Sequence, residues 1–242
     1  MSVHTQFDNA QPVTGLEYLI VLRFTGLHPN DLGRFGMHDK RQGGDLSHVD
    51  SALSDLNEEL LAGPRWKDVI QAEVREASQS NLTEHLRALT AKSRKKEARA
   101  VETAGLVDPW QRSKGGPLRE GILTVSKEWF GGTGHNGWDP KKVARFRKAA
   151  MAFLKRHFPD GQLRYASAHA DEEAYHIHFV VAVWRERTTA NRGRQIRLQA
   201  SMNPWSAPTD CSGLNVSALS VSGPFARRPL GLVACNSERC AA

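Results

Sequence analysis

The sequence predicts an α+β fold with a mainly antiparallel central sheet flanked by helices. Strand-like and helix-like runs follow one another along the chain in the order strand, helix, strand, helix, strand, strand. The last two strand-like runs, 162–169 and 176–184, are joined by only six residues. Such a short connection joins antiparallel neighbours, because parallel strands need a long crossover.

Local patterns predict the first elements. Residues 16–24 (LEYLIVLRF) are nearly all apolar or β-forming, as in a strand buried on both faces. Glycines and a proline are spread over 26–47, which predicts an irregular loop there. Apolar residues at helical spacing predict a short amphipathic helix over 48–61, and 66–104 is expected to be helical, with a second segment starting near Asn81.

The second half of the chain begins with a strand expected at 121–125. Asp139 and Pro140 form a typical helix start, and the apolar stripe that follows predicts a helix ending near Phe158. This helix carries seven Lys and Arg in sixteen residues with no acid between them. Together with the formal charge of +7 and the pI near 9.5, this pattern favours a polyanionic partner.

Composition bounds the class of protein. The 242 residues form one large or two small domains, and we expect a main domain over 1–200 and a tail over 201–242. The tail is rich in Ser, Pro and Gly and holds all three cysteines, so we interpret it as a disordered end or the scar of a truncation. Without a membrane-length apolar run or a signal pattern, a cytoplasmic location is expected.

Chemistry-bearing residues concentrate in 169–178 (HADEEAYHIH), where three histidines and three carboxylates occupy ten residues. The period of a strand places His176 and His178 on one face, and pairing of the two strands can bring His169 beside either of them. Imidazole and carboxylate ligands without thiolates suit a catalytic metal site. The alternative is that these histidines are half-exposed strand residues.

The same stretch resembles a known family, the MobV group of plasmid mobilisation relaxases, also called Pre or plasmid recombination enzymes, within the HUH endonuclease superfamily. The family's motif H-x-D-E-x-x-x-H-x-H is matched by His169, Asp171, Glu172, His176 and His178. Its first motif and the continuation of that motif are similar to residues 37–50 and to Leu56-Asn57. The resemblance covers about residues 16–200, with departures at Asp39, where some members have Asn, and at Tyr175, where proline is common.

The resemblance implies a metal-dependent, site- and strand-specific DNA endonuclease and strand transferase. Such a relaxase nicks a plasmid origin of transfer through a covalent histidine–DNA intermediate during conjugative mobilisation or plasmid recombination. The nucleophile maps onto His38, with Tyr175 as its rival. A neutral imidazole can attack phosphorus without first losing a proton, which agrees with this assignment.

The resemblance also assigns a cofactor and a DNA-binding set. The cofactor is a divalent metal, Mn²⁺ or Mg²⁺, with Zn²⁺ and Co²⁺ as alternatives. Its expected ligands are His169, His176 and His178. Glu172 is expected to be catalytic, as a fourth ligand or as a residue that orients a histidine. The expected nucleic-acid-binding residues are Lys40, Arg41, Arg145 and Lys148.

The implied partner is plasmid DNA, with the origin hairpin and its adjacent single strand. A homodimer, a coupling protein and accessory mobilisation proteins are further candidates, and no membrane span is expected. Two other functions remain open at this point. One is a truncated, catalytically inactive chain that binds origin DNA, and the other is a metal-dependent enzyme of another sort, such as a phosphodiesterase.

Overall fold

A six-stranded sheet forms the centre of the computed structural model, which describes residues 18, 20–63, 65–110, 115–199 and 232–236. The strand order is β2-β4-β5-β3-β1-β8. The strands are β1 (Ile20–Leu27), β2 (Glu58–Ala62), β3 (Leu118–Val125), β4 (Leu163–His169), β5 (His176–Val181) and β8 (Leu232–Asn236). All neighbours are antiparallel except β8, which runs parallel to β1. The predicted fold class is therefore confirmed.

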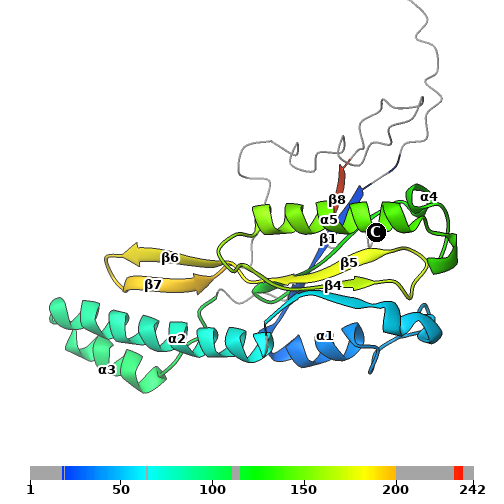
Figure 1. Ribbon diagram of the computed structural model, residues 1–242. Helices are drawn as coiled ribbons and strands as arrows, with labels where there is room; N and C mark the ends of the chain where they lie inside the picture. The colour runs from blue at the N-terminus through cyan, green and yellow to red at the C-terminus, as the bar shows by residue number, and fades with distance from the viewer. Residues whose placement is uncertain (1–17, 19, 64, 111–114, 200–231, 237–242) are drawn as a thin grey trace, which may run out of the picture.

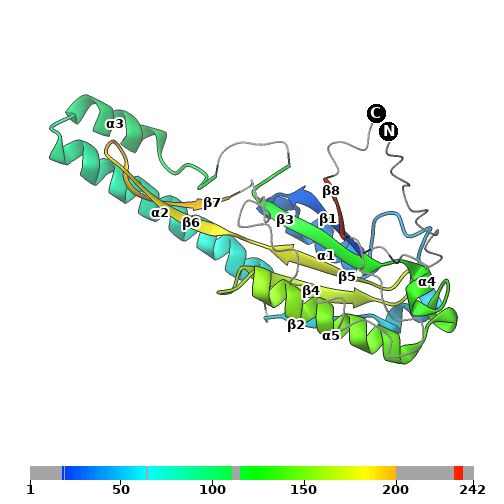
Figure 2. The same cartoon turned by 90° about the horizontal axis from the view of Figure 1, so that it is seen from above.

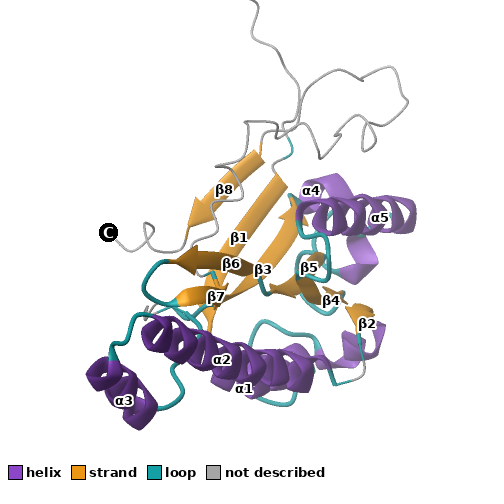
Figure 3. Cartoon of the chain, turned by 90° about the vertical axis from the view of Figure 1, so that its left-hand side faces the viewer, coloured by secondary structure: helices purple, strands orange, loops and turns teal. Residues whose placement is uncertain are grey.

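Helices cover both faces of this sheet (Figures 1 and 3). The helices α4 (Lys127–Phe130) and α5 (Pro140–His157) lie on one face, and α1 (Leu32–Asp39) and α2 (Trp66–Ala91) lie on the other. Each face has its own apolar core, one under α5 and one under α1 and α2. The sheet is thus the middle of three layers.

Alternation along β5 distributes its side chains between the two cores. Ile177 and Phe179 are fully buried in the core under α5. Val180 belongs to the other core, and the ring of His178 lies 4.9 Å from that of Phe35 in α1. Because side chains of a strand alternate between its faces, the histidines of β5 point toward α1 and away from α5.

A smaller two-stranded sheet continues from the end of β5. It consists of β6 (Trp184–Thr189) and β7 (Gly193–Leu198) and lies along α2 (Figures 1 and 2). Helix α3 (Lys95–Ala104) also packs against α2. The sequence pattern predicts a last strand that ends at Trp184 and does not predict this hairpin. Arginines fill many of its positions, so it lacks the apolar alternation that marks a strand.

The expected irregular loop over 26–47 is wrong in its first half. Strand β1 continues to Leu27, a 3-10 helix covers Pro29–Asp31, and α1 follows. The buried positions of α1 are spaced as on one helical face, but they include a glycine and an acid: Leu32, Phe35, Gly36 and Asp39. Burial of Leu32 and Phe35 outweighs the low helix propensity of glycine. Because Gly36 and Asp39 are not apolar, the buried face of this helix does not stand out in the sequence as an apolar stripe.

The expected helix over 48–61 is also wrong. A 3-10 helix spans Ser51–Leu56, where the Asp50 carboxylate accepts a hydrogen bond from the Ala52 amide, and β2 begins at Glu58. Residues 58–62 pair with β4, and this long-range pairing prevails over the local helical spacing.

Other predictions are confirmed. The run 66–104 is helical, although α2 continues past Asn81 and the break comes at 92–94. Asp139 caps α5 by accepting a 2.8 Å hydrogen bond from the Lys141 amide. The division at residue 200 stays a prediction, since the tail lies outside the described residues except for β8. Within the described chain, the structure has no helix that is long and apolar enough to span a membrane.

Gly121 in β3 provides a test of the core under α5. A Cβ at this position would lie 2.2 Å from the ring of Phe179, which is 0% exposed. We expect Gly121→Ala to lower the free energy of unfolding by about 1–3 kcal/mol, because the ring cannot move without displacing its neighbours. Urea denaturation measures this change. Gly33→Ala in α1, which would meet nothing within 4 Å, is the control and should leave stability equal or higher.

Candidate metal centre and active site

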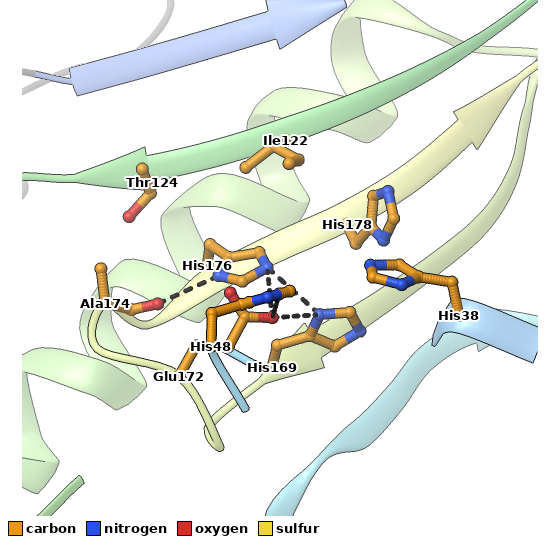
Figure 4. A pocket seen from close by; sticks show the side chains of 9 residues that line it. All are labelled: His38, His48, Ile122, Thr124, His169, Glu172, Ala174, His176 and His178. Atoms are coloured by element: carbon orange, nitrogen blue, oxygen red, sulfur yellow. Dashed lines mark hydrogen bonds and ion pairs between the residues drawn. The ribbon is translucent and has the colours of Figure 1, made fainter. Parts of the chain in front are cut away.

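One pocket of about 220 Å³ is lined by the predicted nucleophile His38 and by Glu172 (Figure 4). The three predicted metal ligands also line it: His169, His176 and His178. His169 ends β4 directly opposite His176 at the start of β5, and His178 follows on the same strand. Glu172 lies in the turn between these strands, and His38 comes from the last turn of α1. The fold thus brings together two segments about 130 residues apart.

Three of these side chains have the spacing of ligands to one metal ion. His169 Nδ1 lies 3.1 Å from His176 Nε2, and Glu172 Oε1 lies 3.6 Å from the first and 3.8 Å from the second. Two ligands each about 2.1 Å from a metal are separated by about 3.0 Å in octahedral and about 3.4 Å in tetrahedral geometry. The donor set therefore fits a divalent cation.

The hydrogen-bond partners of His169 and His176 determine which ring nitrogen of each histidine keeps a free lone pair. His176 Nδ1 lies 3.0 Å from the Ala174 carbonyl, which only accepts, so this nitrogen carries the proton. His169 Nε2 lies 3.0 Å from Asp39 Oδ1 and donates to it. The remaining lone pairs, on His169 Nδ1 and His176 Nε2, face each other. Burial lowers the pKa of His176 to about 4, so at neutral pH a cation suits this position better than a proton.

His178 is oriented differently from the other two histidines. Its Nε2 lies 2.7 Å from Glu120 Oε1, and its Nδ1 lies 3.6 Å from Asp39 Oδ1. Burial alone would lower its pKa, but these two carboxylates raise the pKa of His178 to about 9. The predicted triad is thus divided between two groups that share His169, one with Glu172 and His176 and one with Asp39 and His178. A ligand role for His178 stays a prediction.

Asp39 is a central residue of the site for which the sequence pattern predicts no role. It is 6% exposed and accepts hydrogen bonds from Ser167 Oγ at 2.6 Å, from the Tyr165 hydroxyl and from His169. Burial would raise its pKa, but these bonds and the nearby imidazole of His178 hold the pKa of this carboxyl well below its usual range. The sequence feature that could have pointed to Asp39 is its position directly after His38 in the first motif. Glu120 had no such signal, because it meets His178 only through strand pairing.

Arg41 joins the first motif to the turn that carries Glu172. Its Nε and Nη2 donate to the two carboxylate oxygens of Asp171 at 2.9 and 2.6 Å, and Nη2 also lies 2.7 Å from Glu172 Oε1. The Arg41 side chain is only 7% exposed. Asp171 also accepts from Ser54 Oγ and Asn57 Nδ2. This placement favours a positioning role for Arg41 over the predicted contact with DNA.

The charge of Asp171 should therefore matter for stability. We expect Asp171→Asn to lower the free energy of unfolding by about 3 kcal/mol, because it leaves the buried Arg41 guanidinium without its bidentate partner. Urea denaturation at pH 7 measures this loss. The contribution is present above the unfolded pKa of about 3.9 and disappears as the pH falls toward about 2, to which the folded pKa is lowered. Asp68→Asn, in an exposed pair with Arg65, should cost under about 1 kcal/mol.

The remaining predicted DNA contacts lie in two places. Lys40 is exposed at the end of α1, next to His38. Arg145 and Lys148 belong to α5, which covers the opposite face of the sheet from the pocket. The structure does not bring these two side chains together with the histidines, and their contact with DNA stays a prediction.

His38 and its rival Tyr175 have opposite environments. His38 is half-buried at the pocket, and burial together with Arg41 lowers its pKa, so the imidazole is neutral at pH 7. Gly44, at φ +95°, passes close to it, since a Cβ there would lie 3.1 Å from His38 Nδ1. Tyr175 is 3% exposed, packs against Phe130 and Phe146 in the core under α5, and has its pKa raised to about 12 by burial. Of these two candidate nucleophiles, His38 lines the pocket and Tyr175 does not.

Sequence comparison agrees with this pattern of residues. The family model for the plasmid recombination enzyme, Mob_Pre, matches residues 106–202. A curated plasmid recombination enzyme of Lactiplantibacillus plantarum is 27% identical over 163 residues, which are 65% of this chain and 36% of that protein. The resemblance to the MobV relaxases is confirmed. The chain spans little more than a third of the length of this relative.

Solved structures of a MobV relaxase domain are also similar. One Mn-bound crystal structure of the MobM relaxase domain with plasmid pMV158 oriT DNA has a TM-score of 0.45 and 19% identity, covering 69% of this chain and 71% of that one. A second Mn-bound MobM complex with this DNA has a TM-score of 0.44 and 20% identity, over 67% and 70% of the two chains.

Proposed function

We propose that this MobV-type chain is a divalent-metal-dependent relaxase that nicks one strand of plasmid DNA at an origin of transfer through a covalent bond to His38. One observation carries the proposal. The pocket places a neutral imidazole, that of His38, beside a donor set that fits one metal ion, His169, His176 and Glu172. A nucleophile and a cation site within one pocket are the two requirements of metal-assisted phosphoryl transfer.

The proposed reaction uses the unprotonated nitrogen of His38. This nitrogen forms a bond to the scissile phosphorus, and the bond from phosphorus to the 3′ oxygen breaks. The 3′ oxygen leaves with the electron pair and takes up a proton, while the 5′ end stays on the protein as a phosphoramidate. Attack by a 3′ hydroxyl reverses these steps and rejoins the strand.

Several side chains prepare the site for this reaction. A divalent metal, Mn²⁺ or Mg²⁺, would polarise the non-bridging phosphate oxygens when bound by His169, His176 and Glu172. Asp39 orients the imidazole of His169 through its 3.0 Å contact with Nε2. Arg41 holds the carboxylate of Glu172 in place.

Plasmid DNA is the partner that this proposal requires, and Mn-bound complexes of the MobM relaxase domain with oriT DNA support it by family analogy. The net charge of +7 agrees with a polyanionic substrate. A homodimer, a coupling protein, accessory mobilisation proteins and a cytoplasmic location stay predictions.

A nicking assay tests the proposal. Labelled single-stranded oligonucleotides that tile the DNA upstream of the gene are incubated with the protein and either Mn²⁺ or a chelator, and the products are separated on a denaturing gel. We expect one discrete cut in the presence of Mn²⁺, with the 5′ end linked to protein, and none with the chelator. Binding without any cut would favour the inactive origin-binding chain. Cutting without a covalent product would favour a phosphodiesterase.

A further inference from the structure

Thr124 lies in the pocket and has no part in the reaction proposed above. Among the described residues that line the pocket, it carries the only hydroxyl group. It belongs to β3 and is half-buried directly opposite His176 of β5. Figure 4 shows it next to Ile122, at the wall of the pocket that β3 forms. The pocket thus holds one neutral polar group beside imidazoles and a carboxylate.

The hydroxyl proton of Thr124 is already used within the protein. Its Oγ1 lies 2.7 Å from the carbonyl oxygen of Tyr175 and 3.2 Å from that of Val125. A carbonyl oxygen only accepts hydrogen bonds, so the hydroxyl donates its single proton to one of them, and the shorter contact favours Tyr175. The two lone pairs of Oγ1 remain. Thr124 therefore offers an acceptor, and no donor, to a molecule in the pocket.

The neighbours of Thr124 leave these lone pairs free. Ile122 precedes it on the same face of β3, and Val21 of β1 lies directly opposite it, so both flanking side chains are apolar. No described residue donates a hydrogen bond to its Oγ1. When a substrate displaces water from the pocket, an unpaired acceptor costs free energy. A substrate group that donates a hydrogen bond is therefore favoured at this position.

The strand register places Thr124 and His38 at different ends of the pocket. The ring of His38 lies 6.5 Å from that of His178, which is opposite Ile122. His176 and Thr124 form the pair two residues along these strands, about 7 Å away. Figure 4 shows His38 and Thr124 on opposite sides of the pocket. In phosphoryl transfer the attacking and leaving atoms lie roughly in line on either side of phosphorus, so attack by His38 directs the leaving 3′ oxygen toward Thr124.

The nick produces a group that matches this acceptor. In the intact strand the 3′ oxygen is bonded to phosphorus and carries no proton, so it cannot donate a hydrogen bond. After cleavage it is a hydroxyl, which donates one. A 3′ hydroxyl that donates to Thr124 keeps its own lone pairs for the phosphorus, and this is the arrangement that rejoining requires.

We propose that Thr124 binds the 3′ hydroxyl of the nicked strand and holds it in place for the rejoining step. This inference rests on the proposed function, whose product is that hydroxyl. The Thr124 oxygen accepts a hydrogen bond and takes up no proton, so the covalent steps described above stay as they are. Retention of the 3′ end keeps the two ends of the cut strand together while the 5′ end is bonded to His38.

Binding of two oligonucleotides tests this inference. Both end at the cut found in the nicking assay, and they differ only in the 3′ group, which is a hydroxyl in one and a hydrogen atom in the other. Neither contains the scissile bond. By fluorescence anisotropy in Mn²⁺, we expect the wild-type protein to bind the hydroxyl end about fivefold more tightly, the factor typical of one neutral hydrogen bond. Thr124→Val should remove this preference, and Thr124→Ser, which keeps the oxygen, should retain it.

The same comparison separates binding of the 3′ end from a structural role of Thr124. Thr124→Val also loses the hydrogen bond to the Tyr175 carbonyl, next to His176. A purely structural role would weaken binding of both oligonucleotides equally and lower the affinity for Mn²⁺, whereas the difference between the two within each variant isolates the contact with Thr124. In strand transfer, with the hydroxyl oligonucleotide as acceptor, its KM should rise about fivefold in Thr124→Val. Thr25→Val, at an exposed threonine of β1 outside the pocket lining, is the matched control and should keep the preference.

Three results would overturn the inference. These are equal affinity of the wild-type protein for the two oligonucleotides, a preference that survives in Thr124→Val, or the same loss of preference in Thr25→Val or Thr124→Ser. The first needs no variant, so it decides the question even where a variant folds poorly. Any of them, together with cutting by the wild-type protein, removes this inference alone. Absence of a cut in the nicking assay removes the proposed function, and the inference falls with it.

Discussion

Replacing His38 by alanine is expected to lower the rate of DNA cleavage by at least about a thousandfold, because the covalent bond to DNA cannot form without the attacking nitrogen. Arg41, Asp39 and the donor set are left in place by this change, so the affinity for single-stranded DNA and for Mn²⁺ should change less than about threefold. Single-turnover cleavage of the oligonucleotide that carries the nick site measures the rate.

His48→Ala is the matched control for this prediction. His48 also lines the pocket, but its side chain is 46% exposed and it belongs to neither ligand group. We expect it to retain most of the activity. Cleavage that survives in His38→Ala with a protein-linked product would assign the nucleophile to another residue, and the buried position of Tyr175 makes a local rearrangement necessary before it could serve.

The second large effect is expected from His176→Ala. It removes a donor whose lone pair faces His169 Nδ1 at 3.1 Å, so we expect Mn²⁺ affinity to fall by more than the 10- to 100-fold that loss of a supporting hydrogen bond costs. Isothermal titration calorimetry with Mn²⁺, in the absence of DNA, measures the change. Cleavage should be lost with the metal.

His38→Ala serves as the control in the calorimetry, since His38 lies outside both ligand groups. The two variants should thus separate cleavage from metal binding, because both lose cleavage and only His176→Ala loses the metal. Unchanged Mn²⁺ affinity in His176→Ala would show that the ion binds elsewhere. In that case the group of Asp39, His169 and His178 is the next candidate.

Short-range patterns in the sequence predicted the centre of the site well. The six residues between the last two strands leave little freedom in their register, so His169 was expected beside one of the two histidines of β5, and it lies opposite His176. The start of α5 was equally predictable, because an aspartate followed by proline satisfies the first amides of a helix locally.

Long-range contacts account for what the sequence did not reveal. Helix α1 exists because Leu32 and Phe35 meet the core of a sheet whose strands come much later in the chain. Asp39 is buried as a charge only because hydroxyl and imidazole groups from β4 surround it. Glu120 reaches His178 through the pairing of β3 with β5. All of these contacts join residues that lie far apart in the chain, so a local sequence pattern cannot predict them.

The distance of 130 residues between Arg41 and Asp171 also has a consequence during synthesis. Ribosomes add about 5–20 residues per second, so the segment with His38 leaves the ribosome roughly 7–26 s before the turn that completes the pocket. Loop closure over such a separation is a slow, late step in folding. If the proposed function holds, a nascent chain therefore carries His38 before the proposed metal site can form, and it could cut DNA only after β5 has been made.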